Sequence, residues 1–240
     1  FTRVIVNRIW AHYFGRGLVE QIDDLRATNP PSNEPLLDAL AAHLIELRYD
    51  LRAFTKTLLA SNAYQLSSVT TPANESDEQN YSHAGWRPMA AEVLLDAVSQ
   101  VTGIPEEFNG WPRGYRAIQV WDNKLPSDFL AVFGRPSRQT VCACERGTEP
   151  SIAQALHLMN STNSMQKIID RNGVAAKLAK SNMTPQQIIE ELYLATLSRF
   201  PLPDEQAWMM RAFEESNGRN EAVEDILWTL INSKEFVFNH

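Results

Sequence analysis

The chain has 240 residues, of which 44% are hydrophobic and 21% are charged, so it can bury a sizeable core in one compact unit or in two closely joined ones. Its net charge is -7, and because a phosphate backbone is bound by a surplus of Lys and Arg, we expect no nucleic acid among its partners. The sequence has neither a signal-peptide pattern at its start nor an apolar run near the roughly 18 to 20 residues that cross a bilayer, so we expect no membrane span in it. It starts at Phe1, and we expect it to be a piece of a longer protein.

Apolar residues recur at helical spacing through the first part of the chain, and each run is bounded by a cap, a proline or a glycine. A stretch from 67 to 82 is rich in Ser, Thr and Asn and predicts a surface connection. The predicted helices are residues 1–14, closed by Gly15 and Gly17; a helix capped by Ser32 or Asn33 and running to Leu47; a helix over 51–59, capped by Asp50; and a helix opened by Pro88 and ended by Gly103.

The helical period is lost between residues 103 and 147, where Gly, Pro and aromatic residues dominate. An irregular segment of this length inside a compact chain is uncommon, and it is usually functional or ordered by its own contacts. Residues 115–121 and 139–144 could pair as one small β-ribbon.

Helical patterns resume after residue 148, for which Thr148 is the expected N-cap. Thr184, Pro185 and Gln187 form a capping-box pattern that predicts a further helix, followed by one over 204–215 and a last one capped by Asn220. We therefore predict an all-α protein, a multi-helix orthogonal bundle of about nine helices. We expect a single domain over 1–240, with possible subdivision into 1–103, 104–147 and 148–240.

The chain's two cysteines, Cys142 and Cys144, lie one residue apart in the irregular segment. A disulfide between them would be strained and easily reduced, which suits redox chemistry better than a structural role. A metal site needs three or four ligands, and His157 is the one obvious third ligand. Simple packing as small buried residues is the interpretation that we favour, and the other two stay open.

Three arginines flank the cysteines and are candidates for binding an anion, such as a sulfated or carboxylated sugar: Arg135, Arg138 and Arg146. In a net acidic chain, internal pairing with carboxylates such as Glu145, Asp122 or Asp128, or with helix-terminal carbonyls, is favoured over a binding role.

Arg8 and His12 lie four residues apart in the first predicted helix, so they share a face, as an acid/base residue beside an anion holder would. A lone His on a helix is more often a hydrogen-bonded structural group. Glu92 and Asp96, one turn apart, would be a glycosidase pair only if a cleft opened beside them.

Aromatic residues are common in the irregular segment, and Trp111 and Trp121 are candidates for binding because exposed rings can stack on sugars. The competing interpretation is that these side chains pack against one another inside the segment and form a small core of its own. Signatures of a nucleophile elbow, a phosphate loop, a dinucleotide site or a zinc protease are absent from the sequence.

Several blocks of the sequence, taken in order, resemble a planctomycete family catalogued as domain of unknown function 1553 (DUF 1553). They are Val6–Val19, Glu34–Asp38, Ala91–Ala97, Gly134–Pro136 with Cys142–Arg146, Gln154–Asn160, Leu197–Pro201 and Ser233–His240. The resemblance implies an origin in large exported proteins that often carry a cytochrome-like domain, and hence a periplasmic or cell-surface location. It supplies no catalytic residues, and because the haem-attachment signature is absent here, we expect haem only in a separate domain of the parent protein.

Two functions from different classes follow. The first is a non-catalytic interaction or scaffolding module that contacts other domains of the parent protein through the irregular segment. The second is an extracytoplasmic enzyme domain, with thiol or redox chemistry at Cys142 and Cys144, or hydrolysis of an acidic polysaccharide near His12, Arg135 and Arg138.

Overall fold

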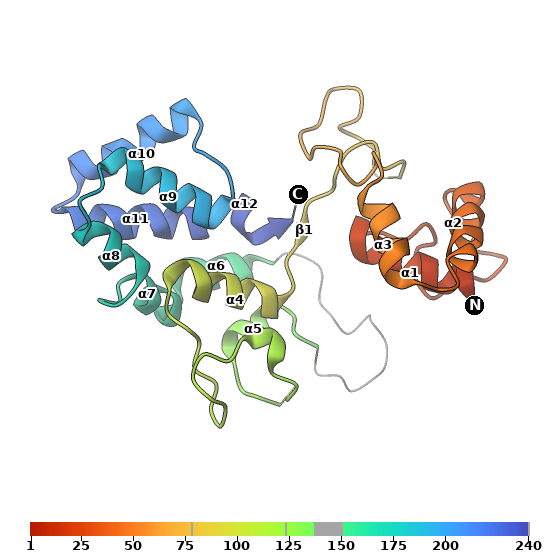
Figure 1. The fold of residues 1–240 in the computed structure, drawn as a ribbon, viewed down its shortest axis with the longest axis horizontal. Helices are drawn as coiled ribbons and strands as arrows, with labels where there is room; N and C mark the ends of the chain where they lie inside the picture. Colours follow the sequence, from red (N-terminus) through yellow and green to blue (C-terminus); the bar gives the residue numbers. More distant parts are fainter. Residues whose placement is uncertain (78, 123, 137–150, 240) are drawn as a thin grey trace. The chain divides into compact units, whose positions relative to one another are not determined.

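The computed structural model describes residues 1–77, 79–122, 124–136 and 151–239 (Figure 1). They form two compact units, an N-terminal unit over residues 1–87 and a C-terminal unit from Pro88 to Asn239. The two units are defined by the contacts between residues, which do not test whether the chain is one family domain. The expectation of a single domain over 1–240 therefore stays a prediction.

The N-terminal unit contains three helices followed by an irregular stretch: α1 (Thr2–Phe14), α2 (Glu34–Glu46) and α3 (Leu51–Leu59). The predicted boundaries of these helices are confirmed to within a residue or two. Helix α1 ends at Gly15, which has φ +79° and donates its backbone N–H to Ala11 O at 2.8 Å. The side chains of Asn33 and Asp50 accept backbone N–H bonds at the starts of α2 and α3.

The core of this unit holds apolar side chains from all three helices. The buried Asn7 and the partly buried Tyr81 are neutral polar groups that help to hold the loops against it. Asn7 is fully buried on α1. Its amide Nδ2 donates to Val19 O and Ile22 O, both at 2.9 Å, and its Oδ1 accepts from Val19 N at 3.0 Å. The hydroxyl of Tyr81 donates to Arg16 O and Gly17 O. Asn7 therefore connects the first helix to the loop that follows it.

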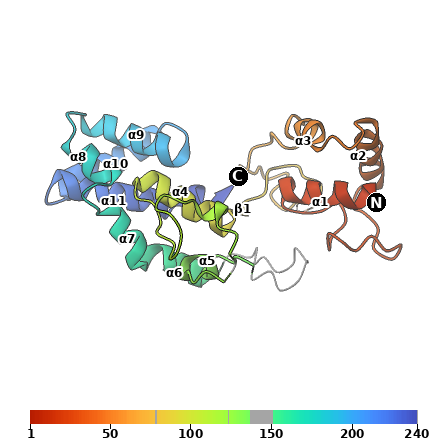
Figure 2. The same ribbon diagram turned by 60° about the horizontal axis from the view of Figure 1, so that its bottom comes forward.

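The C-terminal unit contains nine α-helices among its described residues, and helices α8 to α11 pack against one another (Figures 1 and 2). Its core is formed mainly by α4, α9 and α11 together with apolar side chains of the irregular segment. The helices are α4 (Ala91–Thr102), α5 (Asp128–Val132), α6 (Ile152–Asn160), α7 (Thr162–Ile168), α8 (Val174–Lys180), α9 (Pro185–Leu197), α10 (Pro203–Glu215), α11 (Arg219–Ile231) and α12 (Lys234–Val237).

Local capping signals account for several of these boundaries. The predicted box at α9 is confirmed, since Thr184 Oγ1 accepts from Gln187 N at 3.3 Å and Gln187 Oε1 accepts from Thr184 N at 2.8 Å. Helix α6 starts with the same arrangement between Ser151 and Gln154. The expected cap Thr148 lies outside the described residues.

Two predicted helix starts are wrong. Pro88 does not open α4, because it lies in β1 (Arg87–Pro88) and the next residue, Met89, donates its N–H to Val237 O at 3.1 Å. Asn220 does not cap the last long helix, because Gly218 is the N-cap of α11. Asn220 lies one residue inside that helix, and its side-chain amide donates to Glu224 instead.

The all-α prediction is confirmed: the described residues form twelve α-helices, with one two-stranded sheet of β1 and β2 (Phe238–Asn239). The predicted ribbon is wrong in its first half, since Ala117–Gln119 forms a short 3₁₀ helix, η1. Its second half, 139–144, lies outside the described residues. Within the described ranges, no helix is both long and apolar enough to cross a bilayer.

Candidate functional site

The irregular segment of the C-terminal unit is held down by a carboxylate of α4. Asp96 is buried, and its Oδ1 accepts from Ala117 N at 2.6 Å while its Oδ2 accepts from Ile118 N at 3.3 Å. The guanidinium of Arg116 lies 3.4 Å away. Two adjacent backbone N–H groups that converge on one carboxylate require a tight turn, which explains why η1 replaces the predicted strand.

Arg135 holds the same segment from the other side. Its Nη2 donates to Val120 O at 2.6 Å, and its Nε lies 3.7 Å from Glu92 Oε1. The side chain is only 8% exposed. Internal pairing is thus observed for this arginine, with Glu92 on α4 as its carboxylate in place of the expected Asp122 or Asp128.

Glu92 and Asp96 both lie in buried surroundings, and the structure gives each a partner that holds the irregular segment. In a glycosidase, two carboxyl groups face each other across an open cleft that holds the sugar. The arrangement observed is instead that of two anchors one helical turn apart.

On and beside the backbone that these anchors hold, the segment carries aromatic and apolar side chains that reach solvent. Trp121 is 75% exposed and Ile118 is 56% exposed. Trp111 is partly buried against the core, and its ring centroid lies 5.8 Å from that of Trp121 and 5.1 Å from that of Tyr115. We call Trp111, Tyr115, Ile118 and Trp121 the aromatic surface.

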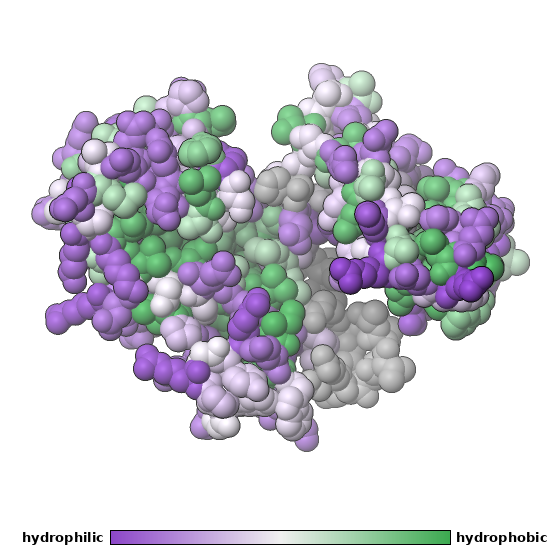
Figure 3. Space-filling model, viewed as in Figure 1, coloured by the Kyte–Doolittle hydropathy of each residue, from purple (hydrophilic) through white to green (hydrophobic). Residues whose placement is uncertain are grey.

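This surface combines fixed backbone with exposed side chains. Val120, next to Trp121, is held by Arg135, and the N–H of Ile118 is held by Asp96. Because the neighbouring backbone is tied to α4, covering the exposed rings costs side-chain freedom but little further backbone freedom. Figure 3 shows that hydrophobic residues come to the surface in several places on the face of the molecule that it draws.

His157, the expected third metal ligand, lies on α6 and packs edge-on against two aromatic rings, 5.6 Å from Phe129 and 6.1 Å from Phe133. Among the described residues there is no group of three or more His, Cys, Asp and Glu side chains that could hold a metal ion. Four of the candidate residues lie outside the described ranges, so their predicted roles stay predictions: Arg138, Cys142, Cys144 and Arg146.

The candidates of α1 lie in the N-terminal unit. Arg8 donates from Nε and Nη2 to the two carboxylate oxygens of Asp23 at 2.6 and 2.9 Å, and these hydrogen bonds hold the pKa of Asp23 below its usual value. The guanidinium group of Arg8 therefore already binds a carboxylate of the same chain. His12 is exposed, its ring lies edge-on to Tyr13, and its backbone oxygen accepts from Arg87 Nη1 at 2.9 Å.

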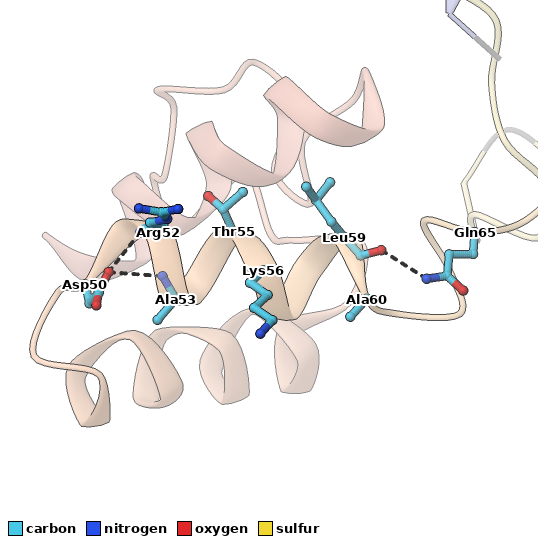
Figure 4. A pocket seen from close by; sticks show the side chains of 8 residues that line it. All are labelled: Asp50, Arg52, Ala53, Thr55, Lys56, Leu59, Ala60 and Gln65. Carbon is cyan, nitrogen blue, oxygen red and sulfur yellow. Dashed lines mark hydrogen bonds between the residues drawn. The ribbon is translucent and has the colours of Figure 1, made fainter. Parts of the chain in front are cut away.

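A hollow of about 730 Å³ lies over the outer face of α3 (Figure 4). The cations Arg52 and Lys56 and the apolar Leu59 are among its lining residues. A second hollow, of about 400 Å³, is lined by the polar residues Ser76, Asp77, Gln79 and Asn80. Neither of these two hollows is lined by a residue that the sequence marks as a candidate.

Two further charge clusters escaped the sequence analysis. Lys167, 4% exposed, lies 3.2 Å from Glu106 Oε2 and donates to Ile104 O at 2.9 Å, so it fixes the start of the irregular segment. Arg199 donates to both carboxylate oxygens of Glu205 and of Glu235, each at 2.7 Å. These bonds raise the pKa of Arg199 and lower that of Glu205.

The described residues fold as an all-α protein. Most of the candidate residues among them are engaged in internal contacts. A family model described as "Protein of unknown function (DUF1553)" matches residues 1–213, and the chain belongs to this family. The search of the curated proteins and the search of the solved structures each return no match.

Proposed function

We propose that the chain is a non-catalytic interaction module of an exported bacterial multidomain protein, and that the aromatic surface is where it holds a partner domain. The observation that carries this proposal is that Trp121 is 75% exposed while the residue before it is tethered by the buried Arg135. Aromatic side chains on a rigid support are the usual centres of binding energy in protein interfaces.

The charge around the surface indicates the kind of partner. Arg113 and Arg116 have ion pairs with Glu107 and Asp96, yet most of the surface of both arginine side chains is exposed. Arg and Trp are enriched together at interface centres, and exposed guanidinium groups favour an acidic rim. The partner surface should therefore be apolar at its centre and acidic at its edge.

The location and the neighbouring domain belong to the same proposal. The resemblance to exported proteins supports an extracytoplasmic location and a cytochrome-like domain in the parent protein, which would carry any haem, with no cofactor in this chain. The competing enzyme hypothesis has two forms, thiol or redox chemistry at Cys142 and Cys144, and hydrolysis of an acidic polysaccharide near His12, Arg135 and Arg138. Arg135 is engaged with Val120 O and Glu92, and no observation on the described residues favours either form.

The test is to replace Trp121 by Ser in the parent protein and to measure, by cross-linking and mass spectrometry in the source cells, which domain contacts residues 111–121. Trp208→Ser is the matched control, because Trp208 is 68% exposed on α10 of the same unit. We expect the cross-links to one defined protein domain to fall about tenfold in Trp121→Ser and to persist in Trp208→Ser. Unchanged cross-links in Trp121→Ser, or a polysaccharide as the bound species, would contradict the proposal.

A further inference from the structure

The dipeptide Asn-Gly is chemically reactive, and it occurs three times in the chain, starting at Asn109, Asn172 and Asn217. The backbone nitrogen of the glycine can attack the side-chain carbon Cγ of the asparagine, because glycine has no Cβ to hinder the approach. The bond from glycine N to Cγ forms, the bond from Cγ to Nδ2 breaks, and the proton of the glycine N–H leaves with the ammonia. Water then opens the resulting succinimide ring to aspartate or isoaspartate, so the reaction consumes water and no other reactant.

In a folded chain, the rate of this reaction depends on how tightly the two residues are held. The glycine nitrogen reaches Cγ through rotation of the asparagine backbone, so hydrogen bonds that fix either residue have to break first. Each such bond slows the attack by up to about tenfold. Because all three sites have the same dipeptide, the structure around each one decides which of them reacts.

The site at Asn109 is the least restrained of the three. It lies in a β-turn over residues 108–111, which is closed by the N–H of Trp111 donating to Phe108 O at 2.9 Å. Asn109 and Gly110 are the exposed central residues of this turn, and in the part of the chain that the structure describes neither the Asn109 side chain nor the Gly110 N–H forms a hydrogen bond. Gly110 has φ +83°, and no atom beyond its adjacent residues lies within 4 Å of the place that a Cβ would take. The ends of the turn are thus fixed, while its reactive centre can rotate.

The site at Asn172 is held on both of its residues. Gly173 is buried, and its N–H donates to Asp170 O at 2.9 Å. A Cβ at Gly173 would lie 3.2 Å from the backbone oxygen of Thr102, so there is little room for the glycine to move. The N–H of Asn172 donates to Asp170 Oδ1 at 2.8 Å. At least two hydrogen bonds therefore oppose the reaction here.

The site at Asn217 is exposed but tied to helix α11. Gly218 is the N-cap of this helix, and its carbonyl accepts from Ala222 N at 3.1 Å. The N–H of Asn217 donates to Glu221 Oε2 at 3.0 Å. The carboxylate of Glu221 also opposes the negative charge that develops on the glycine nitrogen as it loses its proton. Both the backbone and the local charge therefore slow the attack at this site.

We propose that Asn109 is a site of spontaneous deamidation, and that the fold makes it react at least about tenfold faster than Asn172 and Asn217. The product places a carboxylate two residues before Trp111, beside the aromatic surface. One consequence rests on the proposed function: the new charge repels a partner with an acidic rim, so the contact weakens as the protein ages.

The test is to incubate the folded 240-residue chain at pH 8 and to follow the three sites by peptide mass spectrometry, because conversion of the amide to an acid changes the mass. The same incubation in concentrated urea is the control, since unfolding removes the restraints and should bring the three rates close together. We expect Asn109 to lead by at least about tenfold in the folded chain only. Comparable rates in the folded chain would overturn the proposal, and so would a lead of Asn109 that persists in urea or an Asn109 that reacts only in urea.

Two variants sharpen the result. Asn109→Gln should abolish the fast reaction and keep the wild-type circular dichroism spectrum, because glutamine would have to close a larger ring and Asn109 is exposed. Asn109→Asp carries the charge of the product from the start and should lower the cross-links of the parent protein severalfold. Unchanged cross-links in Asn109→Asp, with a loss in Trp121→Ser, would overturn the effect on the contact. The mass measurement needs no partner, so it decides on the deamidation site even where Trp121→Ser contradicts the proposed function.

Discussion

The buried side chains that hold the irregular stretches differ in chemistry between the two units. In the N-terminal unit, the neutral amide of Asn7 makes three hydrogen bonds to the backbone of Val19 and Ile22. In the C-terminal unit, the charged side chains of Asp96 and Arg135 each form a hydrogen bond to the backbone of the irregular segment. We therefore expect the stability of the C-terminal segment to depend on pH and on ion pairing more strongly than that of the loop held by Asn7.

The largest effect is expected from Arg135→Met, which removes the donor to Val120 O and the ion-pair partner at Glu92. Loss of this buried hydrogen-bond donor together with the ion pair to Glu92 should cost about 3 to 4 kcal/mol of unfolding free energy. Hydrogen exchange should also rise at residues 117–121 and not in the N-terminal unit. Arg116→Met is the control, because this side chain is 63% exposed and its removal should cost under about 1 kcal/mol. Equal effects of the two variants in urea unfolding would show that Arg135 is not an anchor.

Asn7→Leu should be next, since it removes the side-chain partner of the buried N–H and carbonyl of Val19 and of the partly buried carbonyl of Ile22. We expect a loss of about 2 to 3 kcal/mol in unfolding free energy. Because an amide does not titrate, the loss should be the same at pH 4 and pH 7. A loss that changes with pH would remove the contrast between the units.

Glu205→Gln should have a smaller effect, and one that depends on pH. Hydrogen bonds from Arg199 lower the pKa of Glu205 in the folded state. A carboxyl group of this kind stabilises the fold above its unfolded pKa, about 4.3, and this contribution is lost as the pH falls through the folded value. The variant should be about 1 kcal/mol less stable than wild type at pH 7, since the pair is partly exposed, and the difference should vanish on acidification. Urea unfolding from pH 3 to 7 measures it, and a difference that grows in acid would refute the assignment.

The smallest effect is expected from Arg8→Ala. The pair of Arg8 and Asp23 is 58% and 44% exposed, so its removal should cost no more than about 0.5 kcal/mol, and less in salt. Thermal unfolding at low and high ionic strength provides the measurement. A loss of several kcal/mol would mean that the N-terminal unit also depends on ion pairs.

Sequence patterns predicted the helices well where the signals are local. The caps Asp50 and Thr184 each contact residues within three positions, so their spacing alone identifies them. The predictions from Pro88 and Asn220 were wrong for different reasons. The backbone after Pro88 is bonded to Val237, and Gly218 takes the N-cap position of α11. The short helices α5, α7, α8 and α12 have too few turns to show a period.

The anchors of the candidate site were harder to predict because their partners lie far along the chain. Asp96 bonds to residues 117 and 118, and Arg135 bonds to residue 120 and lies beside Glu92. One signal was available: Glu92 and Asp96 interrupt a helix that is otherwise mostly apolar and buried. A carboxylate on the inward face of a helix requires a partner, and its position could have suggested the anchor role without naming the residue it holds.

The geometry of Trp111 and Trp121 has a spectroscopic consequence. Their indole rings lie 5.8 Å apart and are inclined by 72°, close enough for their electronic transitions to couple. Coupled indoles give paired circular dichroism bands of opposite sign, and these bands disappear when the rings move apart. The protein thus carries an intrinsic optical reporter, through which the closure of a bound molecule over this part of the chain can be followed in solution without any label.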